Sequence, residues 1–343
     1  MRTALLIVIA GVVATIAVAT LLGAFRPSPP SSATVDGSPF AVASGTTAHA
    51  ASATPASPSP APPEGSASIA PSEAPSPDPV LIGTGDIATC DHNFDEQTAR
   101  LAARNEGIVF TLGDNAYSRG TLAEYRDCYD PSWGRVKART EFPVPGNHDY
   151  GTANAAGYRG YFGKRATPDG DTWYSRDVGA WHVIVLDANC TEIAGGCGSG
   201  SPQLRWLRRD LAASDALCTL AMWHQPRFSS GIEHGNDPAV APFWDALYAA
   251  DADLVLNGHD HDYERFAPQD PDGNPDDQRG ITEVVVGTGG GEMRDMGETK
   301  PNSIVRRGQL LGVFQVTLHP DGWSYRFIST DGSFADSGTA ACH

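Results

Sequence analysis

Five short apolar segments of this chain are each followed within a few residues by a carboxylate, amide or imidazole side chain, and this repeated pattern restricts the possible folds. Apolar runs of this length predict buried strands. In open α/β sheets, sites form in crevices at the carboxyl ends of the strands, so we expect these polar side chains to converge. The segments and the residues that follow them are 80–85 with Asp86, 108–112 with Asp114 and Tyr117, 142–144 with Asn147 and His148, 217–223 with His224, and 254–257 with His259 and His261.

Helical segments separate many of these strands in the first two thirds of the folded region. Patterns at 95–106, 201–213 and 238–250 predict helices, and a further apolar run predicts a strand at 181–187. This alternation indicates a mainly parallel sheet covered by helices. Later runs follow one another without helices, which predicts antiparallel closure of a sheet at 282–286, 311–318 and 323–328. The predicted class is α/β, with a two-sheet β-sandwich flanked by helices.

The histidines of Gly258-His259-Asp260-His261 stand two residues apart, directly after an apolar run. Side chains at i and i+2 of an extended segment point to the same side, so both rings are expected to face one site. Neutral imidazole is the commonest protein metal ligand. Together with the other strand ends, the pair predicts a dinuclear metal site.

The N-terminal residues have the composition of an export segment and a spacer. Residues 4–25 are apolar and uncharged, and at ~1.5 Å per residue such a helix spans a bilayer core of ~30 Å. Residues 1–26 are therefore predicted to be a signal anchor, or a signal peptide cleaved near Ala17-Val18-Ala19. Residues 27–79, rich in Pro, Ser and Ala, are predicted to be a disordered linker, and residues 80–343 the catalytic domain.

The formal net charge of −17 excludes some partners. Such a field repels nucleic acid and anionic membrane surfaces, so no nucleic acid is expected and a membrane is contacted only through the N-terminal segment. Phosphate esters are also repelled at long range, so an anionic substrate needs strong local positive charge, which a metal centre supplies. The oligomeric state is left open.

The chain has six cysteines, all after position 80. In a chain with an export segment, an even number of cysteines predicts disulfides, and free buried thiols are the alternative. Proximity in sequence suggests one pair, Cys190 with Cys197. The predicted location is extracytoplasmic, either membrane-anchored or secreted.

The ordered motifs GD, GDxxY, GNHD, H and GHxHxYER resemble those of the calcineurin-like metallophosphoesterases, and within them the purple acid phosphatases, over about residues 80–330. The resemblance implies a four-layer αββα fold. Ordinary members resemble D-x-H at the first motif, whereas this chain has Ala88 at the His position and Tyr117 three residues after Asp114, as in purple acid phosphatases. It implies that Asp86, Asp114, Tyr117 and His261 bind one metal, and Asp114, Asn147, His224 and His259 the other, with Asp114 bridging.

The implied cofactors are two metal ions. Phenolate is a hard anionic donor, so Fe(III) is expected at the first site, and Fe(II), Zn(II) or Mn(II) at the second. The alternative is that Tyr117 is a packing aromatic beside a more general di-metal centre. Two such cations bind phosphoryl oxygens and lower the pKa of a bound water to produce hydroxide.

Three further residues are candidates for the chemistry. His148 follows Asn147 and is expected to bind phosphate or to protonate the leaving alkoxide, with Asp149 orienting its ring. His234 is a second candidate for contacting the ester, the alternative being a solvated loop histidine. His92 is a weaker candidate.

These inferences predict an extracytoplasmic dinuclear-metal phosphoesterase, of the acid phosphatase type that hydrolyses phosphate monoesters. A phosphodiesterase on the same site is one alternative. The other is a tethered surface protein that binds metal or a phosphorylated polymer without turnover.

Overall fold

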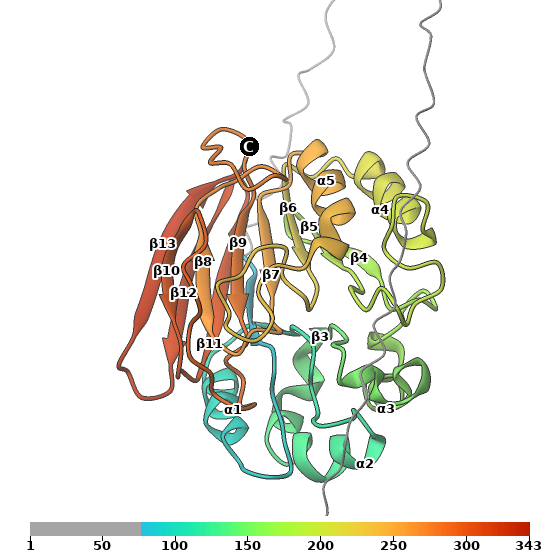
Figure 1. Cartoon of the computed structure of the whole chain (residues 1–343), viewed down its shortest axis with the longest axis vertical. Helices are drawn as coiled ribbons and strands as arrows, with labels where there is room; N and C mark the ends of the chain where they lie inside the picture. The colour runs from blue at the N-terminus through green and yellow to red at the C-terminus, as the bar shows by residue number, and fades with distance from the viewer. Residues whose placement is uncertain (1–76) are drawn as a thin grey trace, which may run out of the picture. The chain divides into compact units, whose positions relative to one another are not determined.

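The computed structural model describes residues 77–343 (Figure 1). The predicted export segment at 1–26 and nearly all of the predicted linker lie outside the described residues. Among the helices that are described, none is both long and apolar enough to cross a membrane. The first strand begins at Val80 and the last ends at Ala341.

The described chain contains strands β1 to β13, helices α1 to α5 and several short 3₁₀ or π turns. In chain order the strands and α-helices are β1 (Val80–Thr84), α1 (Asp95–Arg104), β2 (Ile108–Thr111), α2 (Leu122–Glu124), β3 (Thr140–Phe142), α3 (Ala156–Phe162), β4 (Tyr174–Val178), β5 (Trp181–Val185), α4 (Pro202–Ala213), β6 (Cys218–Met222), α5 (Ala241–Ala249), β7 (Leu254–Asn257), β8 (Tyr263–Phe266), β9 (Thr282–Val286), β10 (Ser303–Arg307), β11 (Gly312–His319), β12 (Gly322–Ser329) and β13 (Ala335–Ala341).

The strands form two mixed sheets. One has six strands in the order β13-β12-β11-β1-β2-β3, and the other has seven in the order β10-β8-β9-β7-β6-β5-β4. Strands β1, β2 and β3 are parallel, as are β5, β6, β7 and β9. The late strands β11 and β12 are antiparallel, as predicted, and β13, which was not predicted, continues this pattern.

One local prediction is confirmed in part and another is wrong in its bounds. Strand β9, at the predicted 282–286, pairs antiparallel with β8 and parallel with β7. The strand predicted at 142–144 lies instead at β3, which ends at Phe142. Pro143 and Pro145 have no backbone N–H to donate to a ladder, so the strand stops before them.

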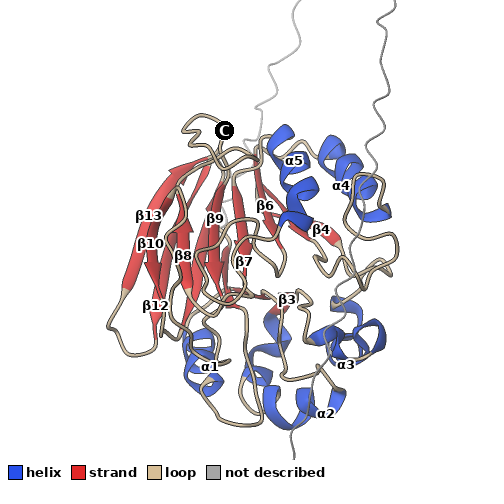
Figure 2. Cartoon of the chain, in the orientation of Figure 1, coloured by secondary structure: helices blue, strands red, loops and turns tan. Residues whose placement is uncertain are grey.

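Helices cover the outer faces of the two sheets, which confirms the four-layer αββα prediction. Alternate residues of β1 show the layering, because Leu81 joins the core between the sheets and Ile82 joins the core under α1. On the other sheet, Leu204 of α4 and Phe243 of α5 pack with Ile184 of β5. Figure 2 shows α4 and α5 grouped on one side of the strands and α1, α2 and α3 on another.

All six cysteines are paired. The predicted Cys190–Cys197 disulfide is confirmed. The others join residues far apart in sequence, Cys90 with Cys128 and Cys218 with Cys342, and proximity along the chain could not indicate them.

His182 on β5 is a buried histidine between two carboxylates. Its Nδ1 lies 2.9 Å from Asp177 and its Nε2 lies 2.8 Å from Asp210. Burial alone would lower the pKa of the ring, but the hydrogen bonds with Asp210 and Asp177 raise the pKa above its ordinary value. The protonated ring therefore stabilises the fold below pH ~6.5, and this contribution is lost as the pH rises through the higher folded pKa.

We expect His182→Asn to lower the free energy of unfolding by about 1–3 kcal/mol near pH ~6, and by less at alkaline pH. Asp177 is 75% exposed, so solvent screens that pair and Asp210 should supply most of the effect. Urea denaturation of both proteins across the pH range measures this difference. A difference that does not change with pH would contradict this interpretation of His182.

Candidate metal centre

The predicted site residues lie just after the carboxyl ends of strands in both sheets. Asp86 follows β1, Asp114 follows β2, His224 follows β6 and His259 follows β7. The loops after β1 and β2 are joined side by side, because the Asp86 backbone N–H donates to the Gly113 carbonyl at 3.0 Å. These side chains therefore follow the strand ends, as predicted.

Three of these residues have left-handed backbone conformations. The φ angles are +59° at Asp86, +48° at Asp114 and +73° at His259. Such angles are uncommon for residues other than glycine and gather at functional sites. The extended geometry predicted for 259–261 is therefore wrong, because tight turns replace it: Asp260 N–H donates to the Gly258 carbonyl at 2.9 Å.

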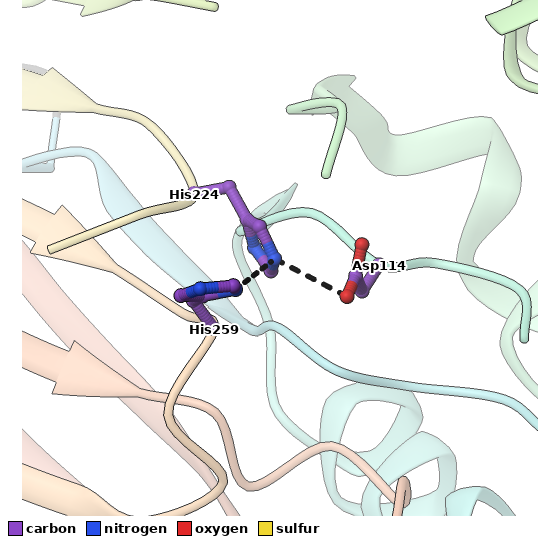
Figure 3. A group of neighbouring side chains, drawn as sticks. All are labelled: Asp114, His224 and His259. Carbon is purple, nitrogen blue, oxygen red and sulfur yellow. Dashed lines mark hydrogen bonds and ion pairs between the residues drawn. The ribbon is translucent and has the colours of Figure 1, made fainter. Parts of the chain in front are cut away.

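One group of side chains contains Asp114, His224 and His259 (Figure 3). His224 Nε2 lies 3.3 Å from Asp114 Oδ2 and 3.2 Å from His259 Nδ1. His224 Nδ1–H donates to the Leu112 carbonyl at 2.6 Å, which leaves Nε2 directed at the other two side chains. This is the orientation that a ligating imidazole needs.

A second group contains Asp86, Tyr117 and His261. The Tyr117 hydroxyl donates to Asp86 Oδ1 at 2.8 Å and lies 3.0 Å from His261 Nε2. His261 Nε2 lies 3.4 Å from Asp86 Oδ1, while its Nδ1 is bonded to the Glu292 carbonyl. The three donor atoms therefore converge on one point.

The two groups adjoin each other. Asp86 Oδ2 accepts the backbone N–H of His259 at 2.8 Å. A side chain at Gly258 would lie 2.7 Å from Asp86 Oδ2 and 3.3 Å from His224, so only glycine fits at this contact. Six of the predicted ligands therefore lie in these two groups, while Asn147, predicted for the second set, belongs to neither.

The ionisable side chains of the centre shift one another's pKa values. Burial alone would raise the pKa of Asp114, but the neighbouring His224 holds it well below the ordinary range. The converse applies to His224, where Asp114 outweighs burial and raises the pKa to about 9. Burial and the nearby His224 and His234 lower the pKa of His259 to about 3, so that ring is neutral.

The donor set fits metal cations. Asp86 and Asp114 are almost fully buried, and the centre contains carboxylate, phenol and imidazole donors without thiolate. Burial and the two carboxylates raise the pKa of Tyr117 well above its ordinary value. A phenolate at this position therefore requires cations close to its oxygen.

Asn147 is the predicted ligand that stands apart from the two groups. Its side chain is exposed and makes no hydrogen bond with the other predicted ligands in the described chain. Its backbone lies nearby, because the next residue, His148, donates its N–H to Asp114 Oδ1 at 2.8 Å. It also lines a small cavity with Tyr150 and Gln225.

His148 lies beside the centre, but Asp149 does not orient it as predicted. The ring is half-buried, with Nε2 3.9 Å from Asp114 Oδ2, and its Nδ1 is bonded to the Ser118 carbonyl at 2.6 Å. Asp149 is buried and accepts hydrogen bonds from the Tyr125 hydroxyl and the Asn115 amide at 2.6 and 2.9 Å. Adjacent side chains diverge here, so Asp149 holds the loop while Ser118 holds the ring.

His234 is exposed, yet it stacks on His259 with ring centroids 3.9 Å apart. Arg294 donates to its Nε2 at 2.9 Å. The ring of His92 contacts that of Phe94 with centroids 4.2 Å apart, and His92 lines a neighbouring cavity.

Sequence reasoning missed the acids that alternate with the histidines after β7. Asp260 Oδ2 accepts hydrogen bonds from Ser229 Oγ at 2.5 Å and from the Gly235 backbone at 3.1 Å. Glu264 accepts two from Ser230 at 2.6 Å. Both carboxylates hold the loop that carries His234. Acidic residues are rarely buried without partners, so acids within a segment predicted to be buried were the signal that could have identified them.

The chain is similar in sequence to known phosphoesterases. A sequence model of the calcineurin-like phosphoesterases matches residues 79–263. Purple acid phosphatase 15 of Arabidopsis thaliana is 26% identical over 231 residues, 57% of this chain and 42% of that protein. An uncharacterized protein of Mycobacterium tuberculosis is 29% identical over 193 residues, 49% of this chain and 36% of that protein. The chain thus spans about two fifths of the length of these relatives.

Among solved structures, a purple acid phosphatase from yellow lupin (Lupinus luteus) seeds superposes with a TM-score of 0.64 at 18% identity. The match covers 78% of this chain and 54% of that chain. At this identity the likeness supports the fold alone.

Proposed function

Because the chain belongs to the calcineurin-like phosphoesterase family, we propose that it hydrolyses phosphate esters at a dinuclear metal centre and acts mainly on monoesters. The observation that carries this proposal is the pair of adjoining donor groups, one around Asp114 and His224 and the other around Asp86 and Tyr117. Burying a carboxylate is costly unless a group of opposite charge compensates it, and bound cations would supply that charge.

The residues divide between two ions as follows. Asp86, Tyr117 and His261 would hold the first, His224, His259 and Asn147 the second, and Asp114 would bridge. When bound, two metal ions would polarise the phosphoryl group and activate the attacking water.

His148 is the proposed acid for the leaving group. Because its Nδ1 is bonded to the Ser118 carbonyl, Nε2 is the atom directed at the centre. In the imidazolium form, Nδ1–H stays with the Ser118 carbonyl while Nε2–H donates a hydrogen bond to the ester oxygen and delivers its proton as the P–O bond breaks, which leaves the neutral ring.

The test compares turnover of 4-nitrophenyl phosphate with that of bis(4-nitrophenyl) phosphate by the full chain supplied with iron and zinc. We expect faster hydrolysis of the monoester. Faster hydrolysis of the diester would replace the monoesterase proposal with a phosphodiesterase. No hydrolysis of either ester would contradict an enzyme and favour a metal-binding or phosphopolymer-binding protein.

An extracytoplasmic location is part of the proposal. Three disulfides support it, because such bonds persist in oxidising compartments. Whether residues 4–25 act as an anchor or as a cleaved signal stays a prediction.

Iron at the first site predicts a visible colour. A tyrosinate bound to Fe(III) absorbs visible light by charge transfer, so the purified protein should be coloured and Tyr117→Phe should lose the band. The near-ultraviolet circular dichroism of the buried tryptophans should be the same in Tyr117→Phe and in the wild type, which shows that the fold is intact. A colourless, active protein containing only zinc or manganese would refute Fe(III) at Tyr117 and leave the esterase proposal standing.

A further inference from the structure

A cavity of about 390 Å³ opens beside the first donor group. Tyr117, His148 and His261 line it, and so does Arg294, which comes from the loop after β9. A substrate whose phosphoryl group sits at the metal centre therefore has a guanidinium at the edge of the same space.

Arg294 makes no ion pair with a carboxylate in the described part of the chain. Its side-chain hydrogen bond is to an imidazole instead: Nη1 donates to His234 Nε2 at 2.9 Å. By contrast, Arg100 and Arg135 both pair with Glu96. A guanidinium is always charged and suits the geometry of phosphate oxygens, so an arginine without an acidic partner beside this centre is available to an anion.

The chain builds a support for this arginine. The Arg294 carbonyl accepts the Gln309 N–H at 2.8 Å, and Gly297 N–H donates to the Ser230 carbonyl at 2.7 Å. Gly231 and Met296 form an isolated antiparallel bridge. The loop with Arg294 is therefore bonded to the loop with His234.

The same support reaches the metal-binding motif. Asp260 and Glu264, on either side of His261, bind the His234 loop through Ser229 and Ser230. Glu264 also accepts a hydrogen bond from Ser303 at the end of the Arg294 loop. Arg294 and His234 are thus held at a fixed place relative to the metal ligands.

We propose that Arg294 binds the non-bridging phosphoryl oxygen that the two metals leave unpaired, and thereby selects monoesters over diesters. The proposal rests on the proposed phosphoesterase function. A monoester dianion has three non-bridging oxygens, so one remains for the guanidinium when two face the metals. A diester has only two such oxygens and presents a second ester oxygen, without formal charge, at that position.

The experiment measures kcat/KM for 4-nitrophenyl phosphate and bis(4-nitrophenyl) phosphate in the metal-loaded full chain and in Arg294→Met. We expect the monoester value to fall by about 10- to 100-fold and the diester value by less than about 3-fold. The affinity for inorganic phosphate, measured by calorimetry, should fall by a factor similar to the monoester loss. Arg205→Met, which removes an exposed arginine on α4, should change none of these values.

Equal losses on both esters, or an unchanged affinity for phosphate, would overturn the role of Arg294. If the wild-type protein hydrolyses neither ester, the proposed function fails, and the phosphate affinities still decide whether Arg294 binds an anion. If Arg294→Met does not fold, Arg294→Lys keeps the charge but not the fork. It should then lose part of the monoester rate and little of the diester rate, and no such selective loss would overturn the proposal.

Discussion

Asp114→Asn should lower kcat/KM for a phosphate monoester by about a thousand-fold or more. The carboxylate lies 3.3 Å from His224 in one donor group. After burial and Asp86, it also raises the pKa of Tyr117 in the other group, which supports its proposed place between both metals. An amide keeps the shape but removes the negative charge that a bridging ligand needs. Loss of several kcal/mol of transition-state stabilisation corresponds to a rate loss of about this size.

Steady-state kinetics and metal analysis of the same samples measure this effect. The metal content of Asp114→Asn should fall below that of the wild type. A matched control is Asp253→Asn, because Asp253 is also buried but lies just before β7, at the opposite end of that strand from His259. This control should be less stable, because it weakens the hydrogen bond that Asp253 accepts from the Thr219 backbone N–H. It should keep its metal and its specific activity. Equal activity in Asp114→Asn and wild type would exclude Asp114 as the bridge.

His148→Ala should lower kcat for a monoester by about 10²- to 10⁴-fold, the usual range for a general acid. The effect should be smaller for an ester with a good leaving group, because such a group departs without protonation. Rates for 4-nitrophenyl phosphate and for an alkyl phosphate measure this difference. The metal content should not change, since the bond from this residue to Asp114 comes from the backbone.

The control for His148 is His319→Ala, which removes a histidine of β11 bonded to Asp78 and Ser324. This variant should retain full activity. A His148→Ala protein with equal losses for both leaving groups would assign phosphate binding, and not proton transfer, to this ring.

Much of the fold was predictable because its central strands are buried on both faces. Strands β5, β6, β7 and β9 are buried throughout, so each appears in the sequence as an apolar run. The missed strands β4, β10 and β13 lie at sheet edges, where one side is exposed and the sequence is polar. Strand β8 was missed because the motif residues Tyr263-Glu264-Arg265 occupy it.

The candidate site was predictable wherever a side chain follows directly on a buried strand. The Asp149 prediction failed because neighbours in sequence need not be neighbours in space, and the fold places the Ser118 carbonyl beside His148 instead. No motif could identify Arg294, because hydrogen bonds between its loop and the His234 loop hold it beside the centre. Such long-range contacts leave no local pattern.

We propose that catalysis depends on two metal ions held together. The most direct measurement is the rate of 4-nitrophenyl phosphate hydrolysis as metal is added stepwise to chelator-treated full-length protein. We expect the rate to rise to a plateau at about 2 equivalents per chain. A plateau at one equivalent, or no hydrolysis at any ratio, would contradict it.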